Sequence, residues 1–127
     1  DAGSVFLGYI FGALVVYSTM LNEVSIYTWI IIFSYFIADT TATQVARLIL
    51  SKKWRKPHRS HAYQNIARII NNHLRVTISV IAYNILWVFP LLILSLTKPD
   101  MALIATILAI TPAFVVSFKY GAFFSSD

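Results

Sequence analysis

The chain has 127 residues, of which 58% are hydrophobic and 12% are charged, and its mean hydropathy is +0.72. Soluble domains are typically about 45–50% apolar, so this composition excludes an ordinary soluble domain and indicates a membrane protein. The net charge is +5. Because the chain has no cysteine, disulfides, thiolate metal sites and a cysteine nucleophile are also excluded.

Four long, almost uncharged stretches predict an all-α integral membrane fold. About 20 apolar residues cross the hydrocarbon core as a helix, and unsatisfied backbone groups exclude irregular spans in lipid. We expect one polytopic domain over residues 1–127, with about four transmembrane helices and a cytoplasmic amphipathic helix. The expected spans are about residues 5–22, 26–46, 76–97 and 101–118. Since there is no initiator Met and no basic segment before the first apolar stretch, we expect a fragment of a longer protein.

The first span begins after Ser4, which we expect to be the N-cap of a helix from Val5 to about Met20. Gly8 and Gly12 form a pair of small residues four positions apart, a spacing that lets another helix approach closely. The alternative is that they are glycines of the kind common in membrane helices, without such a contact.

The other spans contain polar residues or prolines. The second helix, about Ile26 to Leu50, contains Asp39, and an ionisable residue near membrane depth usually faces a cavity or a partner. Alternatively, Asp39 lies at the inner interface, solvated or paired with a basic residue of the following loop. In the third span we expect Pro90 to kink the helix. The fourth contains Pro112, and we interpret the third and fourth spans as scaffold.

Charge is concentrated in the loop 47–75, which holds eight of the ten Lys and Arg residues and all three histidines. Positive-inside asymmetry places this loop and both chain ends in the cytoplasm. From Ser60 onward, apolar residues recur at helical spacing, which predicts an amphipathic helix along the inner membrane face. Its polar side should carry Asn65 and Arg68. Nucleic-acid binding is disfavoured, because no recognised nucleic-acid fold surrounds the basic cluster.

The candidate site gathers residues from the cytoplasmic end of the first helix and from the loop: Asp1, Gly3, Ser4, His58, Arg59 and His61. A carboxylate can hold a hard cation such as Mg²⁺, a helix N-terminus favours phosphate, and Arg and His side chains can clamp phosphate oxygens. These residue types suit phosphoryl transfer at a membrane surface. On spacing alone, solvated or structural histidines are the alternative.

Two segments resemble one enzyme family. DAGSVFLGYIFGAL is similar to the Asp-x-Gly-Ser-x-Phe-Leu-Gly segment of the polyprenyl-phosphate N-acetylhexosamine-1-phosphate transferases. Residues 39–91 resemble the C-terminal part of that family, in the bacterial glycosyltransferase family 4 branch related to the enzymes that start O-antigen and enterobacterial common antigen synthesis. The resemblance covers essentially the whole chain but only the family's C-terminal portion. The upstream Asp-Asp pair and the Asn- and Asp-rich nucleotide loop are absent, so we expect the chain alone to be inactive.

The resemblance implies an enzyme of the bacterial inner membrane with a cytoplasmic catalytic face. It would transfer sugar-1-phosphate from a UDP-N-acetylhexosamine to undecaprenyl phosphate and release UMP, with Mg²⁺ as cofactor. The expected catalytic residues are Asp1, which is also the metal ligand, His58 and His61. The expected substrate-binding residues are Gly3, Ser4 and Arg59.

The sequence His-Arg-Ser-His from His58 to His61 argues against a muramoyl-pentapeptide substrate, because the family members that use it have a tighter histidine cluster. The expected partners are undecaprenyl phosphate, the UDP-sugar and membrane lipids but no nucleic acid, and a homo-oligomer is compatible with the sequence. No role is assigned to Asp39 or Arg47. The competing interpretation is a non-catalytic four-helix membrane protein that binds anionic lipid or a partner through its basic loop.

Overall fold

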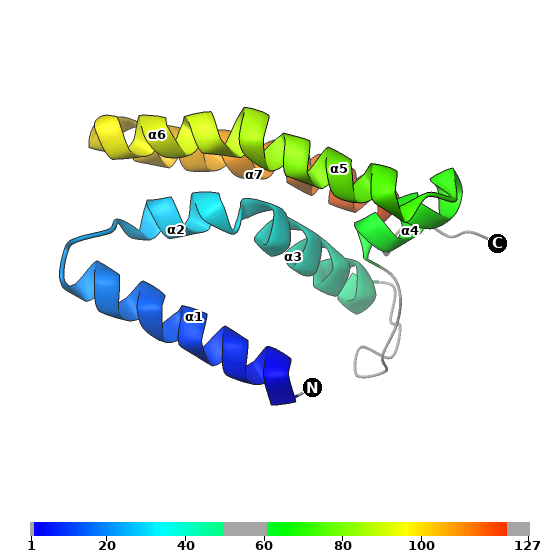
Figure 1. Ribbon diagram of the computed structural model, residues 1–127, viewed down its shortest axis with the longest axis horizontal. Helices are drawn as coiled ribbons and strands as arrows, with labels where there is room; N and C mark the ends of the chain where they lie inside the picture. Colours follow the sequence, from blue (N-terminus) through cyan, green and yellow to red (C-terminus); the bar gives the residue numbers. More distant parts are fainter. Residues whose placement is uncertain (1, 50–60, 122–127) are drawn as a thin grey trace.

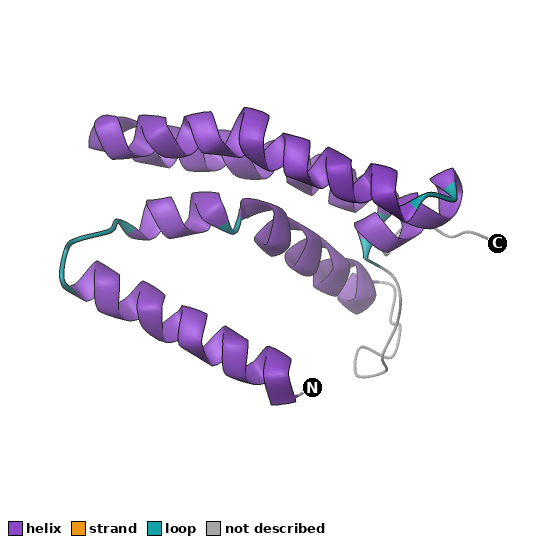
Figure 2. Cartoon of the chain, viewed as in Figure 1, coloured by secondary structure: helices purple, strands orange, loops and turns teal. Residues whose placement is uncertain are grey.

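The computed structural model describes residues 2–49 and 61–121, and all regular elements in these ranges are helical (Figure 2). In chain order they are α1 (Ala2–Met20), α2 (Ile26–Ile32), α3 (Ser34–Ile49), α4 (Ala62–Ile70), α5 (His73–Tyr83), the π-helical turn η1 (Asn84–Val88), α6 (Phe89–Thr97), the 3-10 turn η2 (Pro99–Met101) and α7 (Ala102–Tyr120). The predicted all-α class is therefore confirmed.

Three helical segments are long and apolar enough to cross a membrane: Gly3–Met20, His73–Thr97 and Pro99–Tyr120. They correspond to the first, third and fourth predicted spans. The second predicted span is not one continuous helix, because Phe33 separates α2, with 7 residues, from α3, with 16 residues. Neither half alone has the length of about 20 residues that a span requires.

The segment around the break at Phe33 contains neither Pro nor Gly. The Phe33 backbone has φ −92° and ψ 10°, which lies in a sparsely populated region. Its ring meets Phe11 of α1 edge to face, with 5.6 Å between ring centroids, and stacks on Trp29 at 6.1 Å. The break thus places Phe33 between α1 and α2.

The helix α7 contacts α2, α3, α4 and α6, and in Figure 1 it runs behind α5 and α6. Its main neighbour is α3, and both helices bury alanines at intervals of four residues: Ala38, Ala42 and Ala46 on α3, and Ala105, Ala109 and Ala113 on α7. Small side chains at this interval let two helix backbones approach closely. Small buried side chains therefore line both helices of this pair.

Both prolines of the long helices are accommodated without ending the helix. Just before Pro90 the chain widens into η1, and a π-helical turn is a common way to relieve the clash of a proline ring with the preceding turn. In α7, Pro112 has no N–H to donate to the carbonyl of Leu108. The indole Nε1 of Trp87 donates to that carbonyl instead, at 3.0 Å, so a neighbouring helix satisfies the freed group.

The helix α1 diverges from the bundle and is joined to it mainly through α2 (Figure 1). The Trp29 indole donates a hydrogen bond of 2.9 Å to Ser18 Oγ. Ser4 lies inside α1, which begins at Ala2, so the predicted N-cap at Ser4 is wrong. A Cβ built on Gly8 or Gly12 would have no described atom within 4 Å, so the predicted close helix contact is not made within this part of the chain.

Candidate functional site

The structure describes Gly3, Ser4 and His61 among the predicted site residues. The other three, Asp1, His58 and Arg59, lie outside the described residues. Gly3 and Ser4 are exposed in the first turn of α1, and Figure 1 shows this end of α1 separated from α3 and α4. The described structure therefore does not bring Gly3 or Ser4 against His61.

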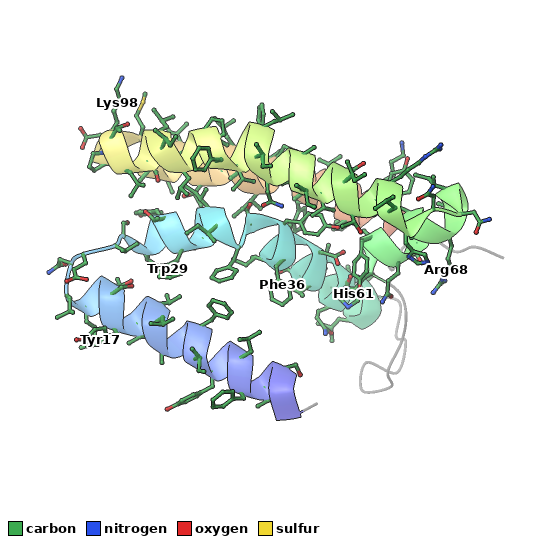
Figure 3. All side chains as sticks on the ribbon, viewed as in Figure 1. Tyr17, Trp29, Phe36, His61, Arg68 and Lys98 are labelled. Atoms are coloured by element: carbon green, nitrogen blue, oxygen red, sulfur yellow. The ribbon has the colours of Figure 1, made fainter. Side chains whose placement is uncertain are left out.

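His61 instead pairs with Asp39, a residue to which the sequence assigned no role. His61 Nδ1 lies 3.0 Å from Asp39 Oδ2, and the side chains of His61 and Asp39 are 34% and 6% exposed. The other carboxylate oxygen, Oδ1, accepts a hydrogen bond of 3.0 Å from the backbone N–H of Ala62. Figure 3 shows His61 where α4 begins, beside α3. A buried carboxylate thus holds a partly exposed imidazole.

The local structure explains why Asp39 can be buried here. It follows Ala38 on the face of α3 that carries the buried alanines. His61 is the N-cap residue of α4, with φ −69° and ψ 146°, and its own side chain makes no capping hydrogen bond. The first N–H groups of a helix need acceptors and favour a negative charge. Asp39 supplies both from a distant part of the chain, so it acts as the cap of α4.

The pairing also determines the orientation of the imidazole. An ionised carboxylate only accepts hydrogen bonds, so an ionised Asp39 would receive this hydrogen bond from a proton on Nδ1 of His61. The second ring nitrogen, Nε2, is then available to another partner. It can accept a proton, or, when the ring is protonated, donate a hydrogen bond to an anionic oxygen such as that of a phosphate.

A second polar contact holds α4 in place. Asn65 Nδ2 donates to the backbone carbonyls of Tyr120 and Gly121, at 2.8 Å and 3.2 Å. These groups lie at the C-terminal end of α7, where carbonyls have no helical donor. The prediction that Asn65 lies on an exposed polar side is therefore wrong: it is buried, with 8% exposure, because it satisfies the end of α7. Arg68, predicted on the same side, is exposed (Figure 3).

Gly121 allows this end of α7 to be closely packed. A Cβ at this position would lie 2.1 Å from the backbone oxygen of Ser117, a distance at which the backbone would have to move.

At the C-terminal end of α4, Asn71 has φ 51°. The Asn72 side chain then accepts a hydrogen bond from the backbone N–H of Arg75, where α5 begins. Asp39 of α3 thus caps the start of α4, and Asn71 and Asn72 form the turn between the end of α4 and α5.

Tyr63 completes the surroundings of His61. The two rings are stacked, with 6.0 Å between centroids and 24° between planes, and Gln64 Nε2 donates to the Tyr63 hydroxyl at 3.1 Å. The imidazole is therefore held by Asp39 on one side and by an aromatic ring on another.

The described residues do not form a site for the expected Mg²⁺. Within residues 2–49 and 61–121, no three His, Asp or Glu side chains come together as metal ligands. Asp39 and His61 offer at most two, and both oxygens of Asp39 already accept hydrogen bonds. Asp1, the predicted ligand, lies outside the described residues.

No family model, no curated protein and no solved structure matches the chain. The resemblance to the sugar-1-phosphate transferases, carried by the Asp-x-Gly-Ser segment and residues 39–91, stays a prediction.

Two features of this candidate site were predicted only in part or not at all. One alternative for Asp39 was pairing with a basic residue of the following loop, and its partner is His61 of that loop. The sequence did not identify which residue, because the partner lies 22 positions away and no local pattern connects the two. Asn65 gave a weaker signal still, because a polar residue in an amphipathic helix is usually solvated. Its acceptors are more than 50 positions away.

Proposed function

We propose that this chain is the C-terminal part of a membrane enzyme that transfers N-acetylhexosamine-1-phosphate from a UDP-sugar to undecaprenyl phosphate. UMP is released, and the product starts O-antigen or a related cell-envelope polysaccharide. The observation that carries the proposal is the buried Asp39 that orients the partly exposed His61. The two motifs that resemble the transferase family support the same function.

In this proposal the chain crosses the bacterial inner membrane four times, with α4 on the cytoplasmic side. The segments α2 and α3 cross together as a broken helix, and a break at membrane depth is tolerated where it is buried in protein. Ser34, directly after the break, is fully buried, and Phe33 packs on Phe11. This topology places His61 at the membrane surface, where a soluble nucleotide-sugar and a lipid phosphate can meet.

The reaction joins an oxygen of the lipid phosphate to the β-phosphorus of the UDP-sugar. The bond from that phosphorus to the bridging oxygen breaks, and UMP leaves with this oxygen and its electron pair. His61, protonated and held through Nδ1 by Asp39, donates from Nε2 to an oxygen of the diphosphate. This contact binds and orients the diphosphate, which is the main task of a protein in phosphoryl transfer. Mg²⁺ is the expected cofactor.

The experiment is release of UMP by the full-length gene product in membranes supplied with undecaprenyl phosphate, Mg²⁺ and a panel of UDP-N-acetylhexosamines. The variant His61→Ala should insert normally but lose about 10–100-fold in rate, because a hydrogen bond to a charged group contributes about 1.5–3 kcal/mol. The matched control is His73→Ala, which removes an exposed histidine from the start of α5 and should leave the rate unchanged.

No UMP from any sugar, with the protein folded and inserted, would reject the proposed transfer. Equal rates for His61→Ala and the unmodified protein would reject the role of His61. If His61→Ala and His73→Ala lost activity equally, the effect would reflect the general loss of an imidazole and not the pairing with Asp39.

A second function is favoured by one observation on α4. Arg68, Ile69 and Ile70 are all exposed in its last turn, a combination that suits contact with an anionic lipid surface. A non-catalytic protein that binds such a surface through α4 would bind anionic vesicles but release no UMP.

A further inference from the structure

The hydroxyl of Tyr63 is a polar group that the start of α4 exposes beside His61. Tyr63 is the second residue of α4 and is 43% exposed. Its ring is stacked with the imidazole of His61, with 6.0 Å between the ring centroids and 24° between the ring planes. Since the two rings lie side by side and nearly parallel, polar groups on their edges can contact the same ligand.

The hydrogen bond from Gln64 determines what the Tyr63 hydroxyl can do. Gln64 Nε2 donates to this hydroxyl at 3.1 Å. A tyrosine hydroxyl carries one proton and accepts through its oxygen, so the bond from Gln64 occupies an acceptor position and leaves the proton. Within residues 2–49 and 61–121, the Tyr63 hydroxyl donates to no protein acceptor. The proton is thus available to a ligand.

The amide of Gln64 is oriented at a cost. Its oxygen, Oε1, is buried and receives no hydrogen bond from the described residues, and a buried acceptor without a donor is unfavourable. With the oxygen directed into the protein, Nε2 of the same amide points to Tyr63. Stability alone does not explain this orientation, whereas an orienting role toward Tyr63 does.

The chemistry of the two exposed groups points to a phosphate oxygen as their acceptor. Protonated His61 offers Nε2–H, and Tyr63 offers its hydroxyl proton. Phosphate oxygens are strong acceptors, and a diphosphate presents several of them on adjacent phosphorus atoms. Asp39, the nearby carboxylate, already accepts from His61 and Ala62 with its two oxygens. The Tyr63 proton is therefore directed to a ligand and not to Asp39.

We propose that Tyr63 is a substrate-binding residue, whose hydroxyl donates to a phosphate oxygen next to the one that accepts from His61. Gln64 is a positioning residue that leaves the hydroxyl proton free for this contact. The inference rests on the proposed function, and it adds two residues that the sequence did not place in the site. Both the UDP-sugar and the lipid phosphate present such oxygens, and the experiment distinguishes them.

The test measures binding without turnover, on the full-length gene product in lipid nanodiscs with Mg²⁺. One arm supplies the panel of UDP-N-acetylhexosamines without acceptor lipid, and the other supplies undecaprenyl phosphate without a UDP-sugar. Tyr63→Phe keeps the ring beside His61 but removes the proton, so it should weaken binding about 10–100-fold in one of the arms. The matched control is Tyr17→Phe, an exposed tyrosine of α1 far from His61 (Figure 3), and should bind normally.

Gln64→Glu tests the role of Gln64, because an ionised carboxylate only accepts hydrogen bonds and would take the Tyr63 proton. We expect Gln64→Glu to weaken binding about as much as Tyr63→Phe does. The double variant should bind no more weakly than the weaker single variant, since both changes remove the same proton. A further loss in the double variant would mean that the added charge repels the phosphate, and would overturn the role of Gln64.

A loss in the UDP-sugar arm assigns the contact to the diphosphate, and a loss in the lipid arm assigns it to the lipid phosphate. Unchanged affinities of Tyr63→Phe in both arms would overturn the inference. Faster hydrogen exchange of the α4 amides in Tyr63→Phe would also overturn it, in favour of a structural role for the hydroxyl.

UMP release measured on the same samples separates this inference from the proposed function. Release by the unmodified protein, together with unchanged binding in Tyr63→Phe, rejects only the role of Tyr63. Binding that depends on the Tyr63 hydroxyl, without release from any sugar, rejects the transfer reaction and leaves a phosphate-binding site at Tyr63 and His61.

Discussion

At the scale of single residues, Asp39 does two things with one carboxylate. One oxygen accepts from the Ala62 N–H and so caps α4, and the other holds His61 Nδ1. The burial of Asp39, at 4% exposure, is compatible with its charge because both oxygens have donors. A structural role and an orienting role therefore coincide in this residue, and substitutions can separate them.

Asp39→Ala should lower the free energy of unfolding by about 1–3 kcal/mol, because the Ala62 N–H then has no acceptor. Asp39→Asn should cost less, since the amide oxygen can still accept from Ala62. The measurement is reversible unfolding in mixed micelles, followed by far-ultraviolet circular dichroism. Thr41→Ala, at an exposed position of the same helix, is the control and should be close to neutral. If Asp39→Ala were as stable as the unmodified chain, Asp39 would not be the cap of α4.

At the scale of elements, α4 is a helix that packs on α7 and α5 and is joined to α3 through Asp39, and not only an amphipathic helix on the membrane surface. Asp39 holds its first turn, and Asn65 connects its middle to the end of α7. The position of His61 depends on both contacts, because His61 directly precedes α4. Docking of this short helix therefore positions the imidazole.

Asn65→Ala should loosen α4, because the carbonyls of Tyr120 and Gly121 lose their donor. We expect hydrogen exchange of the α4 amides to become about tenfold faster, which corresponds to the loss of one net hydrogen bond. The measurement is hydrogen–deuterium exchange of peptides that cover α4. Ile69→Ala, at an exposed position of α4, should exchange at the normal rate. Unchanged exchange in Asn65→Ala would show that Asn65 does not hold α4 in place.

At the scale of the whole molecule, α7 connects the scaffold to the site. Alanines along one face pack on α3, and the C-terminal end of α7 receives Asn65 of α4. The proposed site thus lies at one end of the bundle. Asp39 lies on α3, the main neighbour of α7.

The sequence predicted correctly those features of the fold that depend on residues close together in the chain. Long apolar stretches predicted the helical class and the three long helices, because hydropathy depends on neighbouring residues alone. It did not predict the break at Phe33, the burial of Asn65 or the open surroundings of Gly8. Each of these depends on contacts between distant segments. Asp39 is an intermediate case. Its position in an apolar stretch marked it as notable, but the sequence did not identify His61 as its partner.

The most direct test of the central claim, that Asp39 acts through His61, is a double-mutant cycle on UMP release by the full-length gene product. Asp39→Asn should keep the cap of α4, but its neutral amide cannot make the charge-assisted hydrogen bond by which Asp39 is proposed to hold the protonated His61 through Nδ1. We predict that Asp39→Asn and His61→Ala each lower the rate about 10–100-fold, and that the double variant is no slower than the slower single variant. Losses that multiply would contradict the claim, because Asp39 and His61 would then act independently.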